Sequence, residues 1–208
     1  DTSNEPRTDE EAVAMCTRGL EKATSRQDIA DLQFRLANAQ VRRGFPELAE
    51  TAFRACVAAD PRRIDAFNNL GLLLLRRYDY GAAATEFRRG LAVEETAELL
   101  LNLGVAVEHA GDLNEARRCY ERVITIAPKD SRPHANLGAL FAKRGALDES
   151  IACHRKAVEL APEDPWLAFN LGDALEDAGD DDGAMRAYES AIALPNAKNN
   201  LAGLLERR

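Results

Sequence analysis

The residues with the clearest capacity for chemistry are asparagines that recur at a spacing of 33 or 34 positions. Asn69, Asn102, Asn136 and Asn170 each stand immediately before a Leu-Gly pair. A carboxamide offers both a donor and an acceptor, so it can pair with the C=O and the N–H of a peptide backbone. Because asparagine is neutral to unfavourable inside a helix, its repeated use at one position needs a reason.

Two explanations are open at this point: hydrogen bonds between neighbouring repeats, or a ladder that holds an extended peptide. We favour the ladder, because helices packed roughly 8–10 Å apart match about three residues of extended chain at ~3.3 Å each. At ~1 kcal/mol per hydrogen bond, four rungs cannot offset the cost of association. We therefore expect further anchors on the same face.

Side chains four before, three after and seven after each asparagine share its helical face. Trp166, Asp173 and Asp177 meet on the face of Asn170, so a basic or aromatic residue of the partner is expected there; the alternative for Trp166 is a core position. The candidate peptide-binding residues are Arg35, Asn38, Arg42, Asn69, Arg76, Asn102, His109, Arg132, Asn136, Lys143, Trp166, Asn170, Asp173 and Asp177.

Other reactive groups do not combine into a catalytic or metal site. His109, His134 and His154 lack the spacing of metal ligands. The acidic run at 180–183 resembles a calcium loop, but Ala178 stands where the first ligand should be. No phosphate-binding loop or nucleophile signature is present. We therefore predict a protein that is not an enzyme and that needs neither a metal nor a cofactor.

Composition narrows the class of partner. The net charge of -8 argues against nucleic acid as a partner. The sequence contains no run of 18 apolar residues, so we expect no membrane insertion. Cys119 and Cys153 occupy equivalent repeat positions, so reduced thiols are expected rather than a disulfide framework. A cytoplasmic location is favoured, and a periplasmic or secreted one stays open because the chain begins at Asp1, as a trimmed N-terminus would.

A repeated unit of 33 or 34 residues must position these side chains. In each unit a Leu-Gly or Leu-Ala pair marks a first amphipathic helix, a turn follows, and a second helix carries small and aromatic residues at fixed places. Small residues let the paired helices approach, and the ring fills the space between them. The aromatic position holds Phe53, Phe87, Tyr120, His154 and Tyr188.

This pattern resembles the tetratricopeptide repeat family over about residues 30–194. The resemblance implies an all-α, right-handed superhelical solenoid of antiparallel helix pairs, with five repeats plus terminal capping helices. Ser150 and His154 depart from the family pattern, which has alanine and an aromatic residue there. We predict a disordered lead at 1–8, a capping helix or half repeat at 9–28, repeats at 30–63, 64–96, 97–130, 131–164 and 165–194, and a C-terminal capping helix at 195–208.

In that family the first helices line a concave groove. The resemblance therefore implies a protein-interaction scaffold or adaptor that binds an extended peptide, through a ladder similar to that of the O-linked N-acetylglucosamine transferase family. A chaperone-tail clamp is disfavoured, because Asp31, Asp65 and Glu98 stand where its lysines would be. The alternatives are a self-assembling structural protein and the repeat arm of a larger enzyme or secretion machine.

Overall fold

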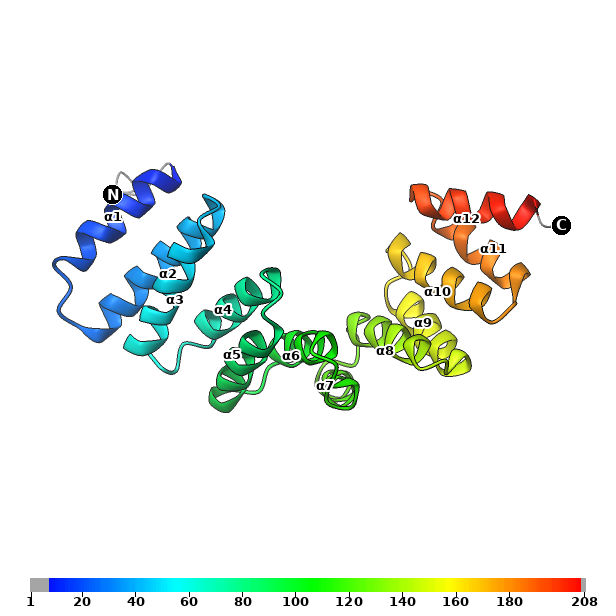
Figure 1. Cartoon of the computed structure of the whole chain (residues 1–208), viewed down its shortest axis with the longest axis horizontal. Helices are drawn as coiled ribbons and strands as arrows, with labels where there is room; N and C mark the ends of the chain where they lie inside the picture. The colour runs from blue at the N-terminus through cyan, green and yellow to red at the C-terminus, as the bar shows by residue number, and fades with distance from the viewer. Residues whose placement is uncertain (1–7, 207–208) are drawn as a thin grey trace. The chain divides into compact units, whose positions relative to one another are not determined.

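The computed structural model describes residues 8–206, which contain α-helices and no strands (Figure 1). The chain divides into two compact units, one up to Asp112 and one from Leu113, and each is described by itself. The N-terminal unit comprises α1 (Asp9–Leu20), α2 (Arg26–Arg42), α3 (Pro46–Ala59), α4 (Ile64–Arg76), α5 (Tyr80–Val93) and α6 (Ala97–His109). The C-terminal unit comprises α7 (Leu113–Ile126), α8 (Arg132–Lys143), α9 (Leu147–Leu160), α10 (Pro165–Asp177), α11 (Asp181–Ser190) and α12 (Pro195–Glu206).

Within each unit every helix packs against the helix that precedes it. Contacts between alternate helices, α4 with α6 and α8 with α10, align the first helices of successive hairpins. This arrangement confirms the predicted all-α solenoid of antiparallel helix pairs. The helices α6 and α7, which the periodicity assigns to one third repeat, belong to different units.

A left-handed residue ends the first helix of each hairpin. Gly44, Gly145 and Gly179 have φ of 77°, 71° and 79°, which glycine adopts without steric cost. The next N–H then reaches back to the helix, as in the 2.9 Å bond from Phe45 N to Gln40 O. Tyr78 occupies the same place with φ of 61° and is the one non-glycine residue in this region among those described.

The small and aromatic positions meet as their spacing predicts. A Cβ at Gly71 would lie 2.4 Å from the ring of Phe87, and a Cβ at Gly172 would lie 2.4 Å from the ring of Tyr188. In the fourth hairpin the imidazole of His154 takes the place of the ring, 2.6 Å from where a Cβ of Gly138 would stand. These hairpins can therefore close only around glycine.

The N-terminal helix differs in length from the prediction. Thr8 caps α1 by accepting a 3.2 Å bond from Glu11 N, and α1 ends at Leu20. Ser25 then caps α2, which begins at Arg26. The helix within the predicted capping segment at 9–28 therefore ends at Leu20, and the next helix begins before the predicted repeat start at 30, because Ser25 caps it. Residues 1–7 of the predicted lead lie outside the described residues.

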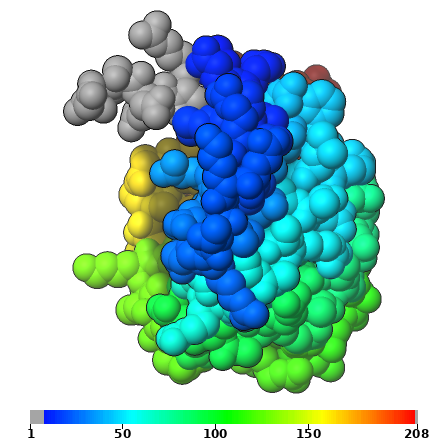
Figure 2. All heavy atoms as spheres, turned by 90° about the vertical axis from the view of Figure 1, so that its left-hand side faces the viewer, coloured from blue at the N-terminus to red at the C-terminus, as the bar shows by residue number. Residues whose placement is uncertain are grey.

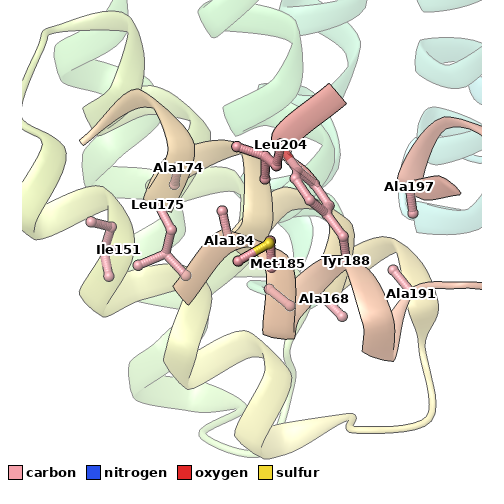
Figure 3. Packing of buried hydrophobic residues seen from close by; sticks show 11 residues of the cluster. Ile151, Ala168, Ala174, Leu175, Ala184, Met185, Tyr188, Ala191, Ala197 and Leu204 are labelled. Atoms are coloured by element: carbon pink, nitrogen blue, oxygen red, sulfur yellow. The ribbon is translucent and has the colours of Figure 1, made fainter. Parts of the chain in front are cut away.

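The buried core of the C-terminal unit is built mainly from small side chains around Tyr188 (Figure 3). Ala197 and Leu204 of α12 are buried there, so α12 closes this end of the stack. All four cysteines are free thiols, and three of them are buried. Burial raises the pKa of Cys56 to about 11, which keeps this thiol protonated and unreactive near neutral pH.

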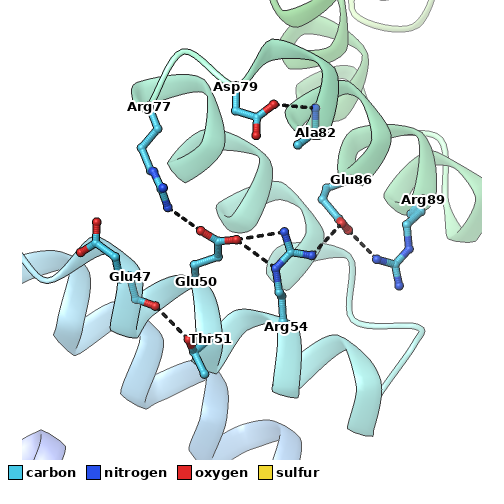
Figure 4. Close-up of polar contacts among 9 residues, drawn as sticks. All are labelled: Glu47, Glu50, Thr51, Arg54, Arg77, Asp79, Ala82, Glu86 and Arg89. Atoms are coloured by element: carbon cyan, nitrogen blue, oxygen red, sulfur yellow. Dashed lines mark hydrogen bonds and ion pairs between the residues drawn. The ribbon is translucent and has the colours of Figure 1, made fainter.

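A chain of ion pairs links the second helices of the N-terminal unit (Figure 4). Arg77 pairs with Glu50 at 2.5 Å, and Glu50 pairs with Arg54 at 2.9 Å. Arg54 also approaches Glu86 at 3.8 Å, and Arg89 pairs with Glu86 at 2.7 Å. Glu86 is only 5% exposed, and its two guanidinium partners explain how a carboxylate is accommodated at such a depth.

Candidate peptide-binding site

In the N-terminal unit the carboxamides of the first helices form hydrogen bonds from one helix to the next. Asn69 Nδ2 on α4 donates to Asn38 Oδ1 on α2 at 3.1 Å. Asn102 Nδ2 on α6 donates to Asn68 Oδ1 on α4 at 2.8 Å. All four side chains are half-buried. Asn69 and Asn102 each use one N–H in stacking, so the hydrogen bonds between repeats that were left open by the sequence are present here.

The residue that accepts the hydrogen bond from each asparagine depends on the sequence of the preceding first helix. The deciding residue there stands three positions after the one equivalent to the asparagine. Where that residue is Asn38, it accepts from Asn69. Where it is Leu72, it cannot accept, and Asn102 turns to Asn68 instead. In the C-terminal unit that residue is Asp173, which accepts a 3.3 Å bond from Asn200 Nδ2 on α12.

Two predicted rungs remain outside this bonding pattern. Asn136 on α8 and Asn170 on α10 are half-buried, and neither carboxamide bonds to another residue within 8–206. The Oδ1 atoms of Asn69 and Asn102 likewise accept no hydrogen bond from the described residues. The C-terminal unit therefore holds two carboxamides with their full bonding capacity, and the N-terminal unit holds two with an acceptor available.

Two hollows lie along the row in the N-terminal unit. The smaller has a volume of about 140 Å³ and lies beside the bonded pair Asn38–Asn69, with Phe53 at its apolar side and Arg76 in its wall. Its remaining lining residues are Val41, Leu72 and Leu73. The larger is a cleft of about 1070 Å³ between α1 and α2, which includes the predicted residues Arg35, Asn38 and Arg42.

The predicted cations of this unit differ in their partners. Arg42 pairs with Asp9 of α1 at 2.7 Å. Arg35 is exposed and forms no ion pair within the described residues. Arg76 is exposed at the end of α4. His109 is exposed as well, but its ring stacks on Tyr80 at 4.9 Å, so it already has an aromatic partner.

In the C-terminal unit, α8 presents basic residues on the face of Asn136. Arg132 forms a 2.8 Å ion pair with Asp130, and Lys143 is exposed at the other end of the helix. Because Arg132 precedes Asn136 by four residues, both side chains lie on one face of α8. A ligand carboxylate at Arg132 would have to share this guanidinium with Asp130.

The helix α10 carries an exposed aromatic group. Trp166 is 54% exposed, so the alternative of a core position for Trp166 is wrong. Its ring meets Phe169 edge-on at 6.1 Å, and Phe169 in turn meets Tyr188 at 5.7 Å. Trp166 thus offers a ring to solvent while it rests on the core, one turn before Asn170.

Asp173 belongs to a polar cluster rather than to the open surface. It accepts a 2.7 Å hydrogen bond from the hydroxyl of Tyr188, which also lies 2.9 Å from Glu176 Oε2. Burial raises the pKa of Asp173, and the nearby charges of Glu176 and Asp177 add to this rise. Asp177 is exposed at the end of α10 and remains the accessible acid of the pair.

Sequence reasoning missed two polar residues of the row. Asn68 was overlooked because no asparagine stands at the equivalent place in the other first helices. Tyr188 was assigned only to the core, because the aromatic position fills the space between the paired helices. Nothing in the sequence indicated a separate role for its hydroxyl. Among residues 8–206 there is no cluster of three metal-ligating side chains, and no helix has the length and apolar character needed to cross a bilayer.

Comparison with known proteins agrees with this architecture. Family models of the tetratricopeptide repeat match residues 34–94, 97–130 and 167–202, and a further model described as a TPR repeat matches residues 140–179. Together they span most of the chain, and the protein belongs to the tetratricopeptide repeat family. No curated protein sequence matches the chain.

Solved structures share the fold at low sequence identity. A MamA fragment from Desulfovibrio magneticus RS-1 has a TM-score of 0.72 at 23% identity, over 82% of this chain and 97% of that one. YrrB, described as a TPR protein with an unusual peptide-binding site, has a TM-score of 0.70 at 17% identity, over 93% and 99%. PilF from Pseudomonas aeruginosa has a TM-score of 0.70 at 20% identity, over 86% and 90%. At these identities the likeness concerns the fold alone.

Proposed function

We propose that this protein is a non-catalytic interaction scaffold that binds an extended segment of another protein along the faces of its first helices. Proteins of this repeat family bind protein or peptide partners, and YrrB is described as having a peptide-binding site. The observation that carries the proposal is the row of half-buried carboxamides with unused bonding capacity, above all Asn136 and Asn170.

The chemistry of the row suits a peptide backbone. The Oδ1 atoms of Asn69 and Asn102 can accept from backbone N–H groups, while Asn136 and Asn170 can both donate and accept. A half-buried amide is partly shielded from water, so a hydrogen bond formed there keeps more of its strength than one on the open surface. Hydrogen bonds to the backbone do not distinguish one sequence from another, so other residues of the protein would have to select the partner's side chains.

Two features would select those side chains. The 140 Å³ hollow beside Asn38 and Asn69 has an apolar wall and could take one small apolar side chain near Arg76. The exposed ring of Trp166 lies near the start of α10 and Asp177 ends the same helix, so a partner segment along α10 would meet a π surface at one end and a negative charge at the other. These anchors supply the free energy that the hydrogen bonds alone cannot.

The test compares two pairs of alanine variants against peptides selected on the intact chain from a displayed library of linear 16-residue sequences. Asn136→Ala with Asn170→Ala removes carboxamides that bond to no described residue, so affinity should fall by about 30-fold for two lost bonds of ~1 kcal/mol each. The melting temperature should stay the same. Calorimetry measures the affinity, and circular dichroism measures the melting.

The matched control is Asn69→Ala with Asn102→Ala, which also breaks the bonds to Asn38 and Asn68. This variant should lose stability as well as affinity. If Asn136→Ala with Asn170→Ala leaves the affinity of every selected peptide unchanged, the row does not bind peptides. If mass by light scattering instead grows with protein concentration in the absence of peptide, self-assembly replaces peptide binding as the function.

A further inference from the structure

The N-terminal helix α1 packs on α2 as a second helix packs on the first helix of the next hairpin, and no described residue supplies a first helix before it. Elsewhere a second helix lies between its own first helix and the first helix of the next hairpin, as α5 lies between α4 and α6. Gly90 of α5 packs 3.0 Å from Leu99 of α6, and Gly19 of α1 packs 3.0 Å from Leu32 of α2, both measured from a Cβ placed on the glycine. The contact that joins one hairpin to the next is therefore present at α1.

Two ion pairs hold α1 antiparallel to α2. Asp9 at the start of α1 pairs with Arg42 at the end of α2 at 2.7 Å, and Glu10 pairs with Arg43 at 3.4 Å. Figure 2 views this end of the N-terminal unit and shows α1 as its outermost helix. No described helix of the unit lies where a first helix would pack against both α1 and α2.

The 1070 Å³ cleft occupies that position. It is lined by Ala12, Met15, Cys16, Gly19, Lys22, Ala23, Asp28, Asp31, Leu32, Phe34, Arg35, Asn38, Arg42 and Arg63. Its volume lies at the upper end of the roughly 300–1,000 Å³ of small-molecule pockets. The cleft runs beside α1, whose 12 residues extend ~18 Å at ~1.5 Å each. Its size and shape thus suit a polypeptide helix of three turns.

The floor of the cleft is apolar and its rim is positively charged. Met15 and Phe34 contribute to the floor, and the guanidinium of Arg63 lies 4.5 Å above the ring of Phe34. The lining contains four cations and two acids, a net charge of +2 in a chain whose total is -8.

Both acids of the lining already have hydrogen-bond partners within the protein, and for Asp31 the partner is a cation. Asp31 is hydrogen-bonded and ion-paired to Arg63, and Asp28 accepts a 2.6 Å bond from Ser25 Oγ. Lys22 and Arg35, in contrast, form no ion pair with any residue within 8–206. Two cations beside an apolar floor call for an anionic, amphipathic occupant.

We propose that this cleft binds an acidic amphipathic α-helix of a partner protein, which packs against α1 and α2 in the manner of a first helix. The apolar stripe of the helix would cover Met15 and Phe34, and its acidic side chains would reach Lys22 and Arg35. This mode differs from the extended peptide proposed above. It depends on residues of the N-terminal unit, whereas the test of the carboxamide row uses Asn136 and Asn170 of the C-terminal unit, so either proposal can fail without the other.

The protein's own α10 supplies a probe of the required chemistry. A peptide of residues 164–179, acetylated, amidated and labelled with fluorescein, carries four acids and no cation. It contains α10, a first helix of this protein, so it has the shape that the cleft beside α1 and α2 should accept. Titration with the intact chain, followed by fluorescence anisotropy, should give saturable binding that weakens as salt increases.

Charge reversal tests the rim. Lys22→Glu with Arg35→Glu should weaken binding of the probe at least tenfold. The matched control, Arg18→Glu with Arg26→Glu, reverses the same number of charges at exposed residues of α1 and α2 that do not line the cleft. An equal loss in both variants would show that the effect is general electrostatics and would overturn the proposal.

Two further measurements test the floor and the helical form of the ligand. Met15→Asp should weaken binding, whereas Ala14→Asp, on the exposed side of α1, should not. A probe with Ala174→Pro cannot form an unbroken helix and should bind at least tenfold more weakly than the parent probe. Equal binding of the two probes would exclude a helical ligand. If the unlabelled chain self-associates and Lys22→Glu with Arg35→Glu abolishes this self-association, the occupant is a second copy of the chain instead.

Discussion

Replacing His154 with phenylalanine should make the C-terminal unit more stable at neutral pH and remove part of its sensitivity to acid. His154 is 3% exposed and its Nδ1 has no hydrogen-bond partner. Its ring packs on Gly138 in the same way that Phe87 packs on Gly71. Phenylalanine therefore fits the family's geometry and removes an unsatisfied buried atom, which should stabilise the unit by about 1–3 kcal/mol.

The effect of pH follows from the burial of the imidazole. Burial lowers the pKa of His154 to about 4, against 6.5 for the exposed side chain. Between these values the unfolded chain binds more protons than the folded chain, so stability falls as the pH decreases from 6.5 toward 4. A difference of this size corresponds to about 3 kcal/mol once the pH is below both values, and to about 2 kcal/mol at pH 5.

Urea unfolding at pH 7.5, 6.0, 5.0 and 4.5, followed by circular dichroism, measures this contribution. Hydrogen exchange of the α8 and α9 amides shows whether the loss is local. The difference in stability between His154→Phe and the parent should grow by about 2 kcal/mol between pH 7.5 and pH 5. The control His109→Gln replaces an exposed histidine of the other unit and should leave the slope unchanged. Parallel pH curves for the parent and His154→Phe would refute the reasoning.

Three other substitutions test features of the fold. Gly172→Ala places a Cβ 2.4 Å from the buried ring of Tyr188 and should cost about 1–3 kcal/mol of unfolding free energy, so a native urea midpoint would contradict the close approach. Tyr78→Gly removes a side chain from a residue with φ of 61° and should raise stability by about 1 kcal/mol; a lower melting temperature would show that the ring contributes more than the strain costs. Tyr188→Phe removes the hydroxyl shared by Asp173, Glu176 and Asn200 and should loosen α12, seen as faster hydrogen exchange there; unchanged exchange would mean that apolar packing alone holds the cap.

The helical hairpins could be predicted because their determinants are short-range and steric. Glycine opposite an aromatic ring sixteen residues later, as in Gly172 and Tyr188, leaves few ways to arrange two helices. Left-handed turns at Gly145 and Gly179 follow from the same local logic. Tyr78 stands at the turn position of its repeat, although its residue type alone would not have indicated a left-handed turn.

The hydrogen bonds of the carboxamides could not be predicted in the same way. The choice of Asn68 over Leu72 as the neighbour of Asn102 depends on which side chain, 30 to 34 residues away, can accept a proton. The exposure of Trp166 and the inward position of Asp173 depend on how α10 turns against α11 and α12. The cleft beside α1 depends on where that helix ends and how it packs on α2, and neither leaves a periodic pattern in the sequence.

The carboxamide bonds between α2, α4 and α6 also give the N-terminal row a chemical direction. Since Asn69 and Asn102 each donate one N–H to a neighbour and accept no hydrogen bond from the described residues, each keeps one N–H and both acceptor sites of Oδ1 available. Such a surface would distinguish partner segments by the number of backbone N–H groups that they can donate. Proline-rich segments would bind this row poorly, because the backbone nitrogen of proline carries no hydrogen to donate. Partners with free backbone N–H groups would bind better.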